Sequence, residues 1–396
     1  MKPTICLVSL PSPFLVDDKT FPNLGVLYLS AALKLHGVQA MVHDGLISEI
    51  PQGFSFYGIS ATTPQYHLAL QAKDKILAEN PHSKIIIGGA HATVDPESCK
   101  RDGFDSVVIG CGERSLPLVM SWNCDLISTP YRAYIRPDRD AIDLSKYHYE
   151  IDGIPATSVM TSRGCPYSCA FCCKSAGKVF LYPADEVIEE LRSLKDDYGY
   201  NAFMFFDDIF VSDPNRLSTI AKAITPWNVR WRGFARADML VHLYDSDLHE
   251  MANSGCAEIG IGIESGSDKI LEIIQKGEDI ATIKQAIRML HRHGIRVKGF
   301  FIVGLPSESR ETISDTIQFC SEVQLDDVDF TVFQPYKGSY IYNHKEDFDI
   351  KWVEKGLREL WYKGRSGTYF SNVWTSQLTQ DEIVDARDYL ERRFKP

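Results

Sequence analysis

Three cysteines are the residues of this sequence whose type and spacing say most about chemistry. Cys165, Cys169 and Cys172 form a Cys-x3-Cys-x2-Cys pattern on a loop that follows a predicted strand. Thiolates are the usual ligands of [4Fe–4S] clusters. Three closely spaced thiolates can bind three irons and leave the fourth iron open to a small molecule that chelates it. The pattern therefore predicts a reactive iron–sulfur centre.

Structural zinc is the alternative interpretation of clustered thiols. A structural zinc site takes four protein ligands, commonly as paired Cys-x2-Cys units. No second pair of this kind lies nearby in the sequence, and Cys173 and His148 are the remaining candidate donors. We therefore favour the iron–sulfur interpretation, and we expect Cys173 to lie beside the cluster without binding it.

Composition narrows the class of protein. The 396 residues suffice for two domains, and the net charge is −11. Proteins that coat nucleic acid phosphates usually carry a basic face, so we expect no nucleic acid partner. No apolar run approaches the ~18 residues of a membrane span, and the N-terminus lacks the features of a signal peptide. We expect no membrane span and a cytoplasmic, reducing location in which clustered thiols are reserved for metal.

The first 125 residues alternate between short β-branched runs and amphipathic helical stretches. Strands are predicted at 4–10, 39–42, 55–60, 84–87 and 106–109, and helices at 24–35, 67–77 and 113–122. This order predicts an open, doubly wound parallel sheet of Rossmann-like type with helices on both faces. Ligands of such sheets lie beyond the carboxyl ends of the strands.

A second α/β series follows a linker. Residues 126–155 carry prolines and charges with little periodicity, which predicts the linker. Between 156 and 345, strands are predicted at 157–161, 202–206, 229–234, 258–263, 296–303 and 328–333, and helices at 184–194, 217–224, 282–291 and 311–322. Six β/α repeats indicate a partial (β/α)6 barrel of TIM-like type. We expect 346–396 to form a helical extension that ends in a helix at 379–393.

These motifs resemble two known families. The cysteine loop, with aromatic Phe171 before its last cysteine, is similar to the signature of the radical S-adenosylmethionine (SAM) superfamily. Four later blocks follow in that family's order, at 205–210, 231–238, 260–267 and 299–306. The first 125 residues resemble the cobalamin (B12)-binding domain of one radical SAM subclass, in the stretches 23–29, 62–66, 88–93 and 110–113. Together the two resemblances cover the chain to about residue 345.

The radical SAM resemblance implies an activity and a site. In the family, the open iron binds the amino and carboxylate groups of SAM, and the reduced cluster breaks a carbon–sulfur bond to give a 5′-deoxyadenosyl radical. The resemblance implies that Glu264 and Ser265 contact the ribose and methionine parts of SAM and that Arg236 lies near its carboxylate. Phe171 and Asp208 would belong to the same site. For Glu264 the alternative is a buried structural salt bridge. A one-electron reductant of flavodoxin or ferredoxin type is also implied.

The B12-domain resemblance implies a cobalamin site that includes Gly88, Gly89, His91 and Thr63. The two glycines would allow the backbone to approach a flat ligand closely, and His91 would contact the ligand or cap the next helix. The Asp-x-His-x-x-Gly loop with which some corrinoid proteins supply an axial imidazole is absent from the sequence, and Cys111 stands where the subclass usually has glutamate. Two interpretations stay open: cobalamin held without a histidine ligand, or a domain kept as a scaffold.

The leading functional hypothesis is a cobalamin-dependent methyltransferase that acts on an unactivated carbon of a small-molecule or natural-product substrate. The alternative is a radical SAM dehydratase, cyclase or epimerase of the same architecture that does not use cobalamin. A non-catalytic corrinoid or iron–sulfur sensor is disfavoured by the block around Glu264, because a sensor needs no adenosyl-binding strand.

Overall fold

The computed structural model describes residues 4–13, 15, 17–122, 125–129, 134–173, 179–353 and 367–396. The chain divides near His148 into two compact units, the first made mainly of residues up to His148 and the second mainly of residues from Tyr149 onward. None of the helices in the described ranges is both long and apolar enough to cross a membrane.

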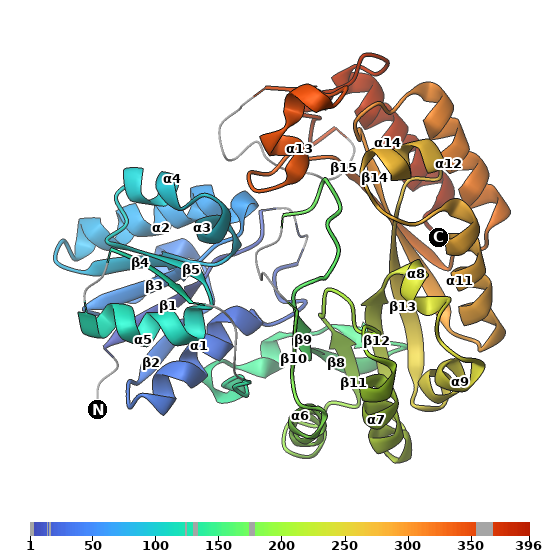
Figure 1. The fold of residues 1–396 in the computed structure, drawn as a ribbon. Coiled ribbons are helices and arrows are strands. Elements are labelled where there is room, and N and C mark those ends of the chain that lie inside the picture. Colours follow the sequence, from blue (N-terminus) through green and yellow to red (C-terminus); the bar gives the residue numbers. More distant parts are fainter. Residues whose placement is uncertain are drawn as a thin grey trace. The chain divides into compact units, whose positions relative to one another are not determined.

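The first unit is built on a six-stranded parallel sheet in the order β2-β1-β3-β4-β5-β6 (Figure 1). Its strands are β1 (Ile5–Ser9), β2 (Ala40–His43), β3 (Phe56–Ser60), β4 (Lys84–Gly88), β5 (Ser106–Gly110) and β6 (Leu126–Thr129). The strand order reverses between β1 and β3, so the sheet is doubly wound. This confirms the predicted fold class of the N-terminal region.

Helices cover both faces of this sheet. They are α1 (Leu24–Leu35), α2 (Tyr66–Glu79), α3 (Ala90–Val94), α4 (Pro96–Arg101) and α5 (Gly112–Trp122), with the 3-10 turns η1 (Ile47–Glu49), η2 (Thr63–Gln65), η3 (Arg139–Ala141) and η4 (Leu144–Lys146). Side chains of β1 alternate between two apolar clusters. Cys6 and Val8 pack in the cluster that includes Ile76 of α2. Ile5 and Leu7 pack in the opposite cluster with residues of α1 and α5. This alternation is the period-2 pattern of a strand buried on both faces.

Strand β6 extends the sheet beyond residue 125, where the sequence pattern placed the start of a linker. It pairs in parallel with β5, with Val107 opposite Leu126. Because it is an edge strand of four residues with Leu126 42% exposed, it carries no buried apolar run that a pattern could detect. Its role in the sheet becomes visible only through the pairing.

The second unit is a curled, mostly parallel sheet in the order β15-β14-β13-β12-β11-β8-β7, with helices on its outside (Figure 1). Its strands are β7 (Glu150–Ile151), β8 (Ile154–Val159), β11 (Ala202–Phe205), β12 (Arg230–Ala235), β13 (Cys256–Glu264), β14 (Arg296–Val303) and β15 (Asp327–Val332). All but β7, which runs antiparallel to β8, are parallel. The six parallel strands confirm the predicted partial barrel.

Most helices of this unit connect successive barrel strands, and the last two follow β15. The helices are α6 (Ala184–Asp196), α7 (Pro214–Ile224), α8 (Ala237–Leu240), α9 (Asp245–Asn253), α10 (Asp268–Ile273), α11 (Ile280–Arg292), α12 (Arg310–Glu322), α13 (Tyr340–Asn343) and α14 (Gln380–Phe394), with η5 (Thr225–Trp227) and η6 (Lys345–Asp347). Short strands β9 (Ser162–Arg163) and β10 (Phe180–Leu181) flank the cysteine loop in the sequence. The barrel strands thus bring their following loops to one end.

The expected helical extension after residue 345 is confirmed at its end, and residues 354–366 of it lie outside the described part of the chain. Helix α14 forms as predicted and is fixed to the barrel by Arg387 Nε, which donates 2.8 Å to the carbonyl of Phe330 in β15. Strands β16 (Lys351–Trp352) and β17 (Val373–Trp374) form an antiparallel pair instead of helix. Two-residue strands are set by their partner and have no periodicity of their own, so the sequence could not show them.

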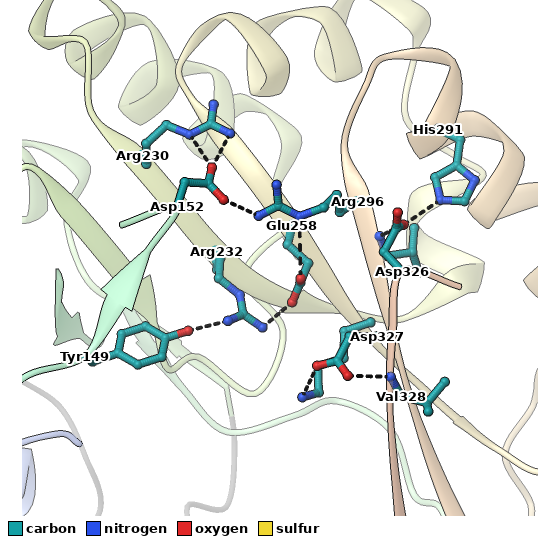
Figure 2. A network of polar contacts seen from close by, with 12 residues as sticks. Tyr149, Asp152, Arg230, Arg232, Glu258, His291, Arg296, Asp326, Asp327 and Val328 are labelled. Carbon is teal, nitrogen blue, oxygen red and sulfur yellow. Dashed lines mark hydrogen bonds and ion pairs between the residues drawn. The ribbon is translucent and has the colours of Figure 1, made fainter. Parts of the chain in front are cut away.

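The amino ends of the barrel strands carry a charged cluster that we call the amino-end network: Tyr149, Asp152, Arg230, Arg232, Glu258 and Arg296 (Figure 2). Asp152 accepts from Arg230 and from Arg296, each at 2.6 Å. Glu258 pairs with Arg232, which also donates to the Tyr149 hydroxyl. The strand register causes this arrangement, because Glu258 lies opposite Arg232 on one side and Arg296 on the other.

Candidate functional site

The cysteine loop lies at the opposite, carboxyl end of the barrel strands, after β8 and β9. Two adjacent carboxylates that follow β11 hold its beginning. Asp207, which is 1% exposed, accepts from the backbone N–H of Thr161 at 2.6 Å and from the Ser162 hydroxyl at 2.6 Å. Asp208 accepts from the N–H of Gly164 at 2.9 Å, immediately before Cys165. The second barrel strand therefore fixes the entry of the loop.

The rest of the loop is held by backbone contacts. The N–H of buried Ala170 donates to Ile274 at the end of α10 (2.8 Å), and its carbonyl accepts from Ile341 of α13 (3.0 Å). A turn within the loop is closed by the N–H of Cys172, which donates to Cys169 (3.1 Å). Cys173 Sγ lies 3.0 Å from the carbonyl of Lys337 and donates to it, so the backbone engages its thiol.

The three predicted ligands lie close enough to influence one another electrostatically. Removal from water raises the pKa of Cys165, and it raises that of Cys172 to about 12 with a further contribution from the negative charges of Cys169, Cys173 and Cys165. The side chain of Cys172 still reaches solvent, although the surrounding chain removes much of its water. Thiolates gathered in this way repel one another, so a cation that replaces their protons would be strongly favoured.

Arg236, just after β12, connects the loop to the barrel. Its Nη1 lies 3.4 Å from Cys169 Sγ, and its guanidinium carbon lies 3.6 Å from the ring centroid of Tyr167. Nη2 donates to the carbonyl of Lys276 at 2.6 Å, and Nε pairs with Asp238 at 3.1 Å. Burial alone lowers the pKa of Arg236, but Asp238 and Glu278 more than offset this and raise it. Arg236 is thus a fixed cation beside a predicted cluster ligand.

Arg236 belongs to a second charged cluster, the carboxyl-end network: Arg236, Asp238, Glu264, Lys276 and Glu278. Lys276 Nζ lies 3.0 Å from Glu264 Oε1 and 3.5 Å from Glu278 Oε2. Glu278 Oε2 is also 3.4 Å from Arg236 Nη2. Burial lowers the pKa of Lys276, yet the two carboxylates more than offset this and hold it above its ordinary value, so the lysine is charged. The network joins the ends of β12 and β13 to the loop before α11.

The backbone at the end of β13 is shaped around Glu264. Glu264 has φ 67°, a left-handed conformation that costs a non-glycine residue energy, and the pairing of β13 with β14 is irregular here. A Cβ at Gly262 would lie 2.6 Å from Glu264 Oε1 and 3.2 Å from Lys276 Nζ. The glycine is therefore needed for the carboxylate to fold back onto Lys276. Ser265, 1% exposed, accepts from the N–H of Ser267 at 3.2 Å.

Besides the cysteines, the sequence predicts five site residues at this end of the barrel. They differ in how directly they contact the cysteine loop. Arg236 reaches Cys169 directly, Asp208 reaches the loop through Gly164, and Glu264 reaches Arg236 only through Lys276 and Glu278. Ser265 follows Glu264, and Phe171 is half-buried within the loop.

The structure adds residues that sequence reasoning did not select as site members: Tyr167, Asp207, Asp238, Lys276 and Glu278. Asp207 and Asp238 lie within the blocks that resemble the family, and Lys276 lies nine residues after the third block, and these positions were their only local signal. Burial of Glu278 and its place in the network depend on the folding of α10 and α11, which no spacing in the sequence encodes.

In the first unit, the predicted glycines lie at the carboxyl edge of the sheet. Gly89 has φ 92°, and a Cβ there would lie 2.8 Å from the carbonyl oxygen of Ala61, so only glycine fits. Gly88 and Gly89 line a pocket of about 40 Å³ together with Gly58, Gly112 and the apolar side chains of Leu29, Ile86, Val108 and Leu116. Such a pocket holds a few waters, so an aromatic ring would enter it only if the lining side chains shift.

His91 and Thr63 form an internal contact of the same unit. His91 is 2% exposed, its ring stacks on Tyr66 at 3.9 Å between centroids, and its Nδ1 and Nε2 lie 3.2 Å from Thr63 Oγ1 and Ser98 Oγ. The imidazole faces the interior of the unit. This arrangement favours a positioning role for His91, which connects the loop after β3 to α3 and α4.

A more open pocket of about 340 Å³ lies beyond the ends of β1 and β2. It is lined by residues after β1, after β2 and after β3, among them Ser12, Asp44 and Gln65. Gln65 Nε2 donates 3.0 Å to the carbonyl of Leu10, and Lys19 pairs with Asp44. The position beside the β1/β3 reversal is where doubly wound sheets bind ligands.

Comparison with known proteins supports the same division of the chain. The model of the radical SAM superfamily matches residues 159–320, and that of the B12 binding domain matches residues 16–120. An uncharacterized methyltransferase of Pyrococcus horikoshii is 30% identical over 372 residues, covering 83% of this chain and 79% of that protein. The anaerobic magnesium-protoporphyrin IX monomethyl ester cyclase of Cereibacter sphaeroides is 24% identical over 377 residues, covering 83% of this chain and 61% of the cyclase.

Two solved structures share the fold. The radical SAM methyltransferase TsrM from Kitasatospora setae, with tryptophan and a SAM analogue bound, aligns with a TM-score of 0.69 at 14% identity, over 89% of this chain and 79% of TsrM. The cobalamin-dependent SAM radical enzyme OxsB aligns with a TM-score of 0.64 at 19% identity, over 87% of this chain and 55% of OxsB.

The chain therefore belongs to the radical SAM superfamily. Its N-terminal unit is a B12-binding domain, which places it among the cobalamin-dependent radical SAM enzymes, whose cofactors are a [4Fe–4S] cluster, SAM and cobalamin.

The residues present fit these groups. In the described part of the chain, no three His, Cys, Asp or Glu side chains converge on a point where a single metal ion would bind. A cubane cluster does not require that, because each of its irons takes its own thiolate. Three gathered cysteines with an N–H donor at one sulfur suit such a cluster. The glycines at the carboxyl edge of the sheet let the backbone approach a flat ligand, whose ring would enter the apolar pocket once the lining side chains shift.

Proposed function

We propose that the protein is a cobalamin-dependent methyltransferase that transfers a methyl group from SAM to an unactivated carbon of a small-molecule or natural-product substrate. The carrying observation is that one chain combines a B12-binding unit with a barrel whose cysteine loop is fixed at the carboxyl ends of the strands. The names of the methyltransferase of Pyrococcus horikoshii and of TsrM support methyl transfer.

In this proposal the chain's own residues bind and orient the reactants. Cys165, Cys169 and Cys172 bind three irons of the cluster, which when bound supplies the electron that cleaves SAM, delivered by a flavodoxin or ferredoxin type of protein. Asp208, Glu264 and Ser265 bind and orient SAM, with Phe171 beside it.

The first unit holds the methyl carrier. Gly88 and Gly89 admit part of cobalamin to the carboxyl edge of the sheet, where a side chain would close the pocket. Thr63 and His91 keep the neighbouring loops in place through their mutual contact. Corrinoid is then held without an imidazole from an Asp-x-His-x-x-Gly loop.

A second candidate function is ring formation without methyl transfer. It is supported by the similarity to the cyclase of Cereibacter sphaeroides, which covers 83% of this chain. Both functions share the cluster and SAM, so they differ in the fate of the methyl group of SAM.

The test is anaerobic reconstitution with iron, sulfide and hydroxocobalamin, followed by desalting, a visible spectrum and a corrinoid assay. The protein is then incubated with methyl-labelled SAM and a strong one-electron reductant. We expect about one retained corrinoid per chain, thiolate-to-iron absorbance, labelled methylcobalamin and 5′-deoxyadenosine. Iron–sulfur absorbance and 5′-deoxyadenosine without retained corrinoid or methyl label would reject methyl transfer and favour the second candidate.

A further inference from the structure

Arg236 touches the cysteine loop in a way that the binding of SAM does not require. Its Nη1 lies 3.4 Å from Cys169 Sγ, within the distance of an N–H···S hydrogen bond. Among the described residues, this is the one hydrogen bond from a charged donor to a sulfur of Cys165, Cys169 or Cys172. The guanidinium is therefore placed to act on the cluster through the ligand sulfur.

The guanidinium has little freedom to leave that position. It stacks on Tyr167, donates to the Lys276 carbonyl at 2.6 Å, and pairs with Asp238 through Nε and Nη2 at 3.1 and 3.2 Å. Its side chain is only 6% exposed. Each of these contacts uses a different edge or face of the planar group, and a rigid fork held on several sides keeps its remaining N–H aimed in one direction.

The direction of this N–H group matters because it points at the sulfur of a predicted cluster ligand. The reduction potential of an iron–sulfur cluster depends on its net charge, its exposure to solvent and the hydrogen bonds to its sulfurs. Reduction adds a negative charge that is shared with the ligand sulfurs. An N–H donor that carries a positive charge stabilises the reduced form more than the oxidised form, so it raises the potential.

The acidic members of the carboxyl-end network limit the long-range part of this effect. Asp238 and Glu278 lie within 3.1–3.4 Å of Arg236 nitrogens and compensate its charge at a distance. The short contact to sulfur is not compensated in the same way, because the carboxylates lie on other edges of the guanidinium. We expect a moderate effect that depends on the geometry of the N–H group.

We propose that Arg236 is a positioning residue that donates a hydrogen bond to the Cys169 sulfur and thereby raises the reduction potential of the [4Fe–4S] cluster. The inference rests on the proposed function in one respect, namely that Cys169 binds the cluster. It differs from the expectation drawn from sequence resemblance, in which Arg236 faces the carboxylate of SAM.

The first experiment is a redox titration of the reconstituted full-length protein, followed by electron paramagnetic resonance of the reduced cluster. Arg236→Met removes donor and charge, and we expect reduction to become about tenfold less favourable, which is ~59 mV for a one-electron couple. Arg236→Lys keeps the charge without the fork, so its potential should lie between those of Arg236→Met and the wild type.

The matched control is Arg232→Met, four residues earlier in the sequence and within β12. Arg232 is also a largely buried arginine paired with a carboxylate, Glu258, but it lies in the amino-end network. Its loss should destabilise the barrel and leave the potential unchanged. An unchanged potential in Arg236→Met, or equal shifts in both variants, would overturn the role of Arg236.

A second measurement can reject the proposal on the wild-type protein alone. The wild-type protein is produced with 15N-labelled arginine, and pulsed electron paramagnetic resonance of the reduced cluster is used to detect coupling to an arginine nitrogen. Absence of this coupling from a wild-type protein with a full cluster overturns the proposal, and coupling that disappears in Arg236→Lys supports it. If the wild-type chain binds no cluster, the proposed function itself fails, which is a distinguishable result.

Discussion

Two charged networks occupy opposite ends of the same partial barrel and are built from the same kinds of residue. In the amino-end network, Arg232 pairs with Glu258 across neighbouring strands, as the strand register dictates (Figure 2). In the carboxyl-end network, Arg236 pairs with Asp238 and Glu278, which lie beyond the strands. The comparison shows that the residue types of an ion pair do not predict its role, whereas its position at one or the other end of the barrel strands does.

The two networks differ in what they touch more than in how the backbone holds them. Each contains a left-handed residue, Asp152 (φ 54°) in one and Glu264 (φ 67°) in the other, and each adjoins an irregular step in the strand pairing. The carboxyl-end network includes a contact with the Cys169 sulfur. Barrels of this type perform chemistry at the carboxyl ends of their strands and use the other end for stability. We therefore expect disruption of the first network to change stability and disruption of the second to change cofactor chemistry.

Loss of a predicted cluster ligand should have the largest effect. In Cys169→Ala we expect most of the cluster to be lost and SAM cleavage to fall by more than the roughly 10–100-fold that loss of an outer partner of a metal ligand costs. Iron content and 5′-deoxyadenosine formation measure this.

The matched control is Cys256→Ala, a buried cysteine at the first residue of β13, near the amino-end network. It should cost about 1 kcal/mol of stability and leave cluster content intact. Full cluster content in Cys169→Ala would contradict the assignment of the site.

Removal of Glu258 should show the structural character of the amino-end network. Glu258→Ala leaves Arg232 without its carboxylate partner in a partly buried position, and such a loss costs about 3 kcal/mol, or roughly 6–12 °C in the melting temperature of a unit this size. The melting temperature and the potential of the cluster are measured together.

The double variant Arg232→Met, Glu258→Met sharpens this test. It removes both charges and replaces them with apolar side chains, so it should be less destabilised than Glu258→Ala alone. A change in cluster potential in either variant would argue against the separation of the two ends.

Removal of Lys276 should act on SAM rather than on the fold. Lys276→Met leaves Glu264 and Glu278 without the cation between them, and we expect Glu264 to lose its orientation toward SAM. A loss of about 1.4 kcal/mol in binding corresponds to a tenfold weaker Kd for SAM. Equilibrium dialysis with the reconstituted protein measures this, and Lys276→Arg should recover part of the affinity. Unchanged affinity would place Glu264 in a purely structural salt bridge.

The sequence predicted the elements well and the networks poorly, for physical reasons. The 2-residue period of apolar residues locates β14 to the residue, because this strand buries one face. Helix α1 also begins and ends at the predicted residues, since its apolar residues are buried around most of the helix. The cysteine spacing marks the loop, because its ligands are neighbours in the chain. The contact of Lys276 with Glu264, and of Arg236 with Glu278, joins residues from different loops whose proximity arises only when the barrel closes.

His91 shows the same limit in the first unit. A histidine after a Gly-Gly pair at the ligand-binding edge of a sheet suggests a contact with the ligand, yet its ring is stacked on Tyr66 and buried. The direction of the His91 side chain depends on how α2, α3 and α4 pack together, and the sequence pattern does not predict that packing. The neighbouring Gly89 was predictable, because its requirement for positive φ is local.

Glu308, after β14, provides the finest test of the comparison, because its effect is confined to a window of pH. It is a buried carboxyl group at the carboxyl end of the barrel, where it accepts from the backbone N–H of Gly304, and no Lys or Arg of the described residues pairs with it. Burial raises its pKa from 4.5 to about 8, although the backbone hydrogen bonds oppose the rise. Glu308 is therefore protonated at neutral pH.

The sign of the resulting pH dependence follows from proton binding. Between pH 4.5 and about 8 the folded chain holds the Glu308 proton that the unfolded chain has released, so stability falls as the pH rises through this window. Glu308→Gln cannot ionise, and we expect it to be more stable than the wild type at pH 8 by on the order of 1–3 kcal/mol, with little difference near pH 5. Melting temperatures between pH 5 and 8.5 measure this, with exposed Glu311→Gln as the control. Parallel curves for Glu308→Gln and the wild type would mean that Glu308 is ionised in the folded barrel, and that a buried carboxylate at this end needs no cation.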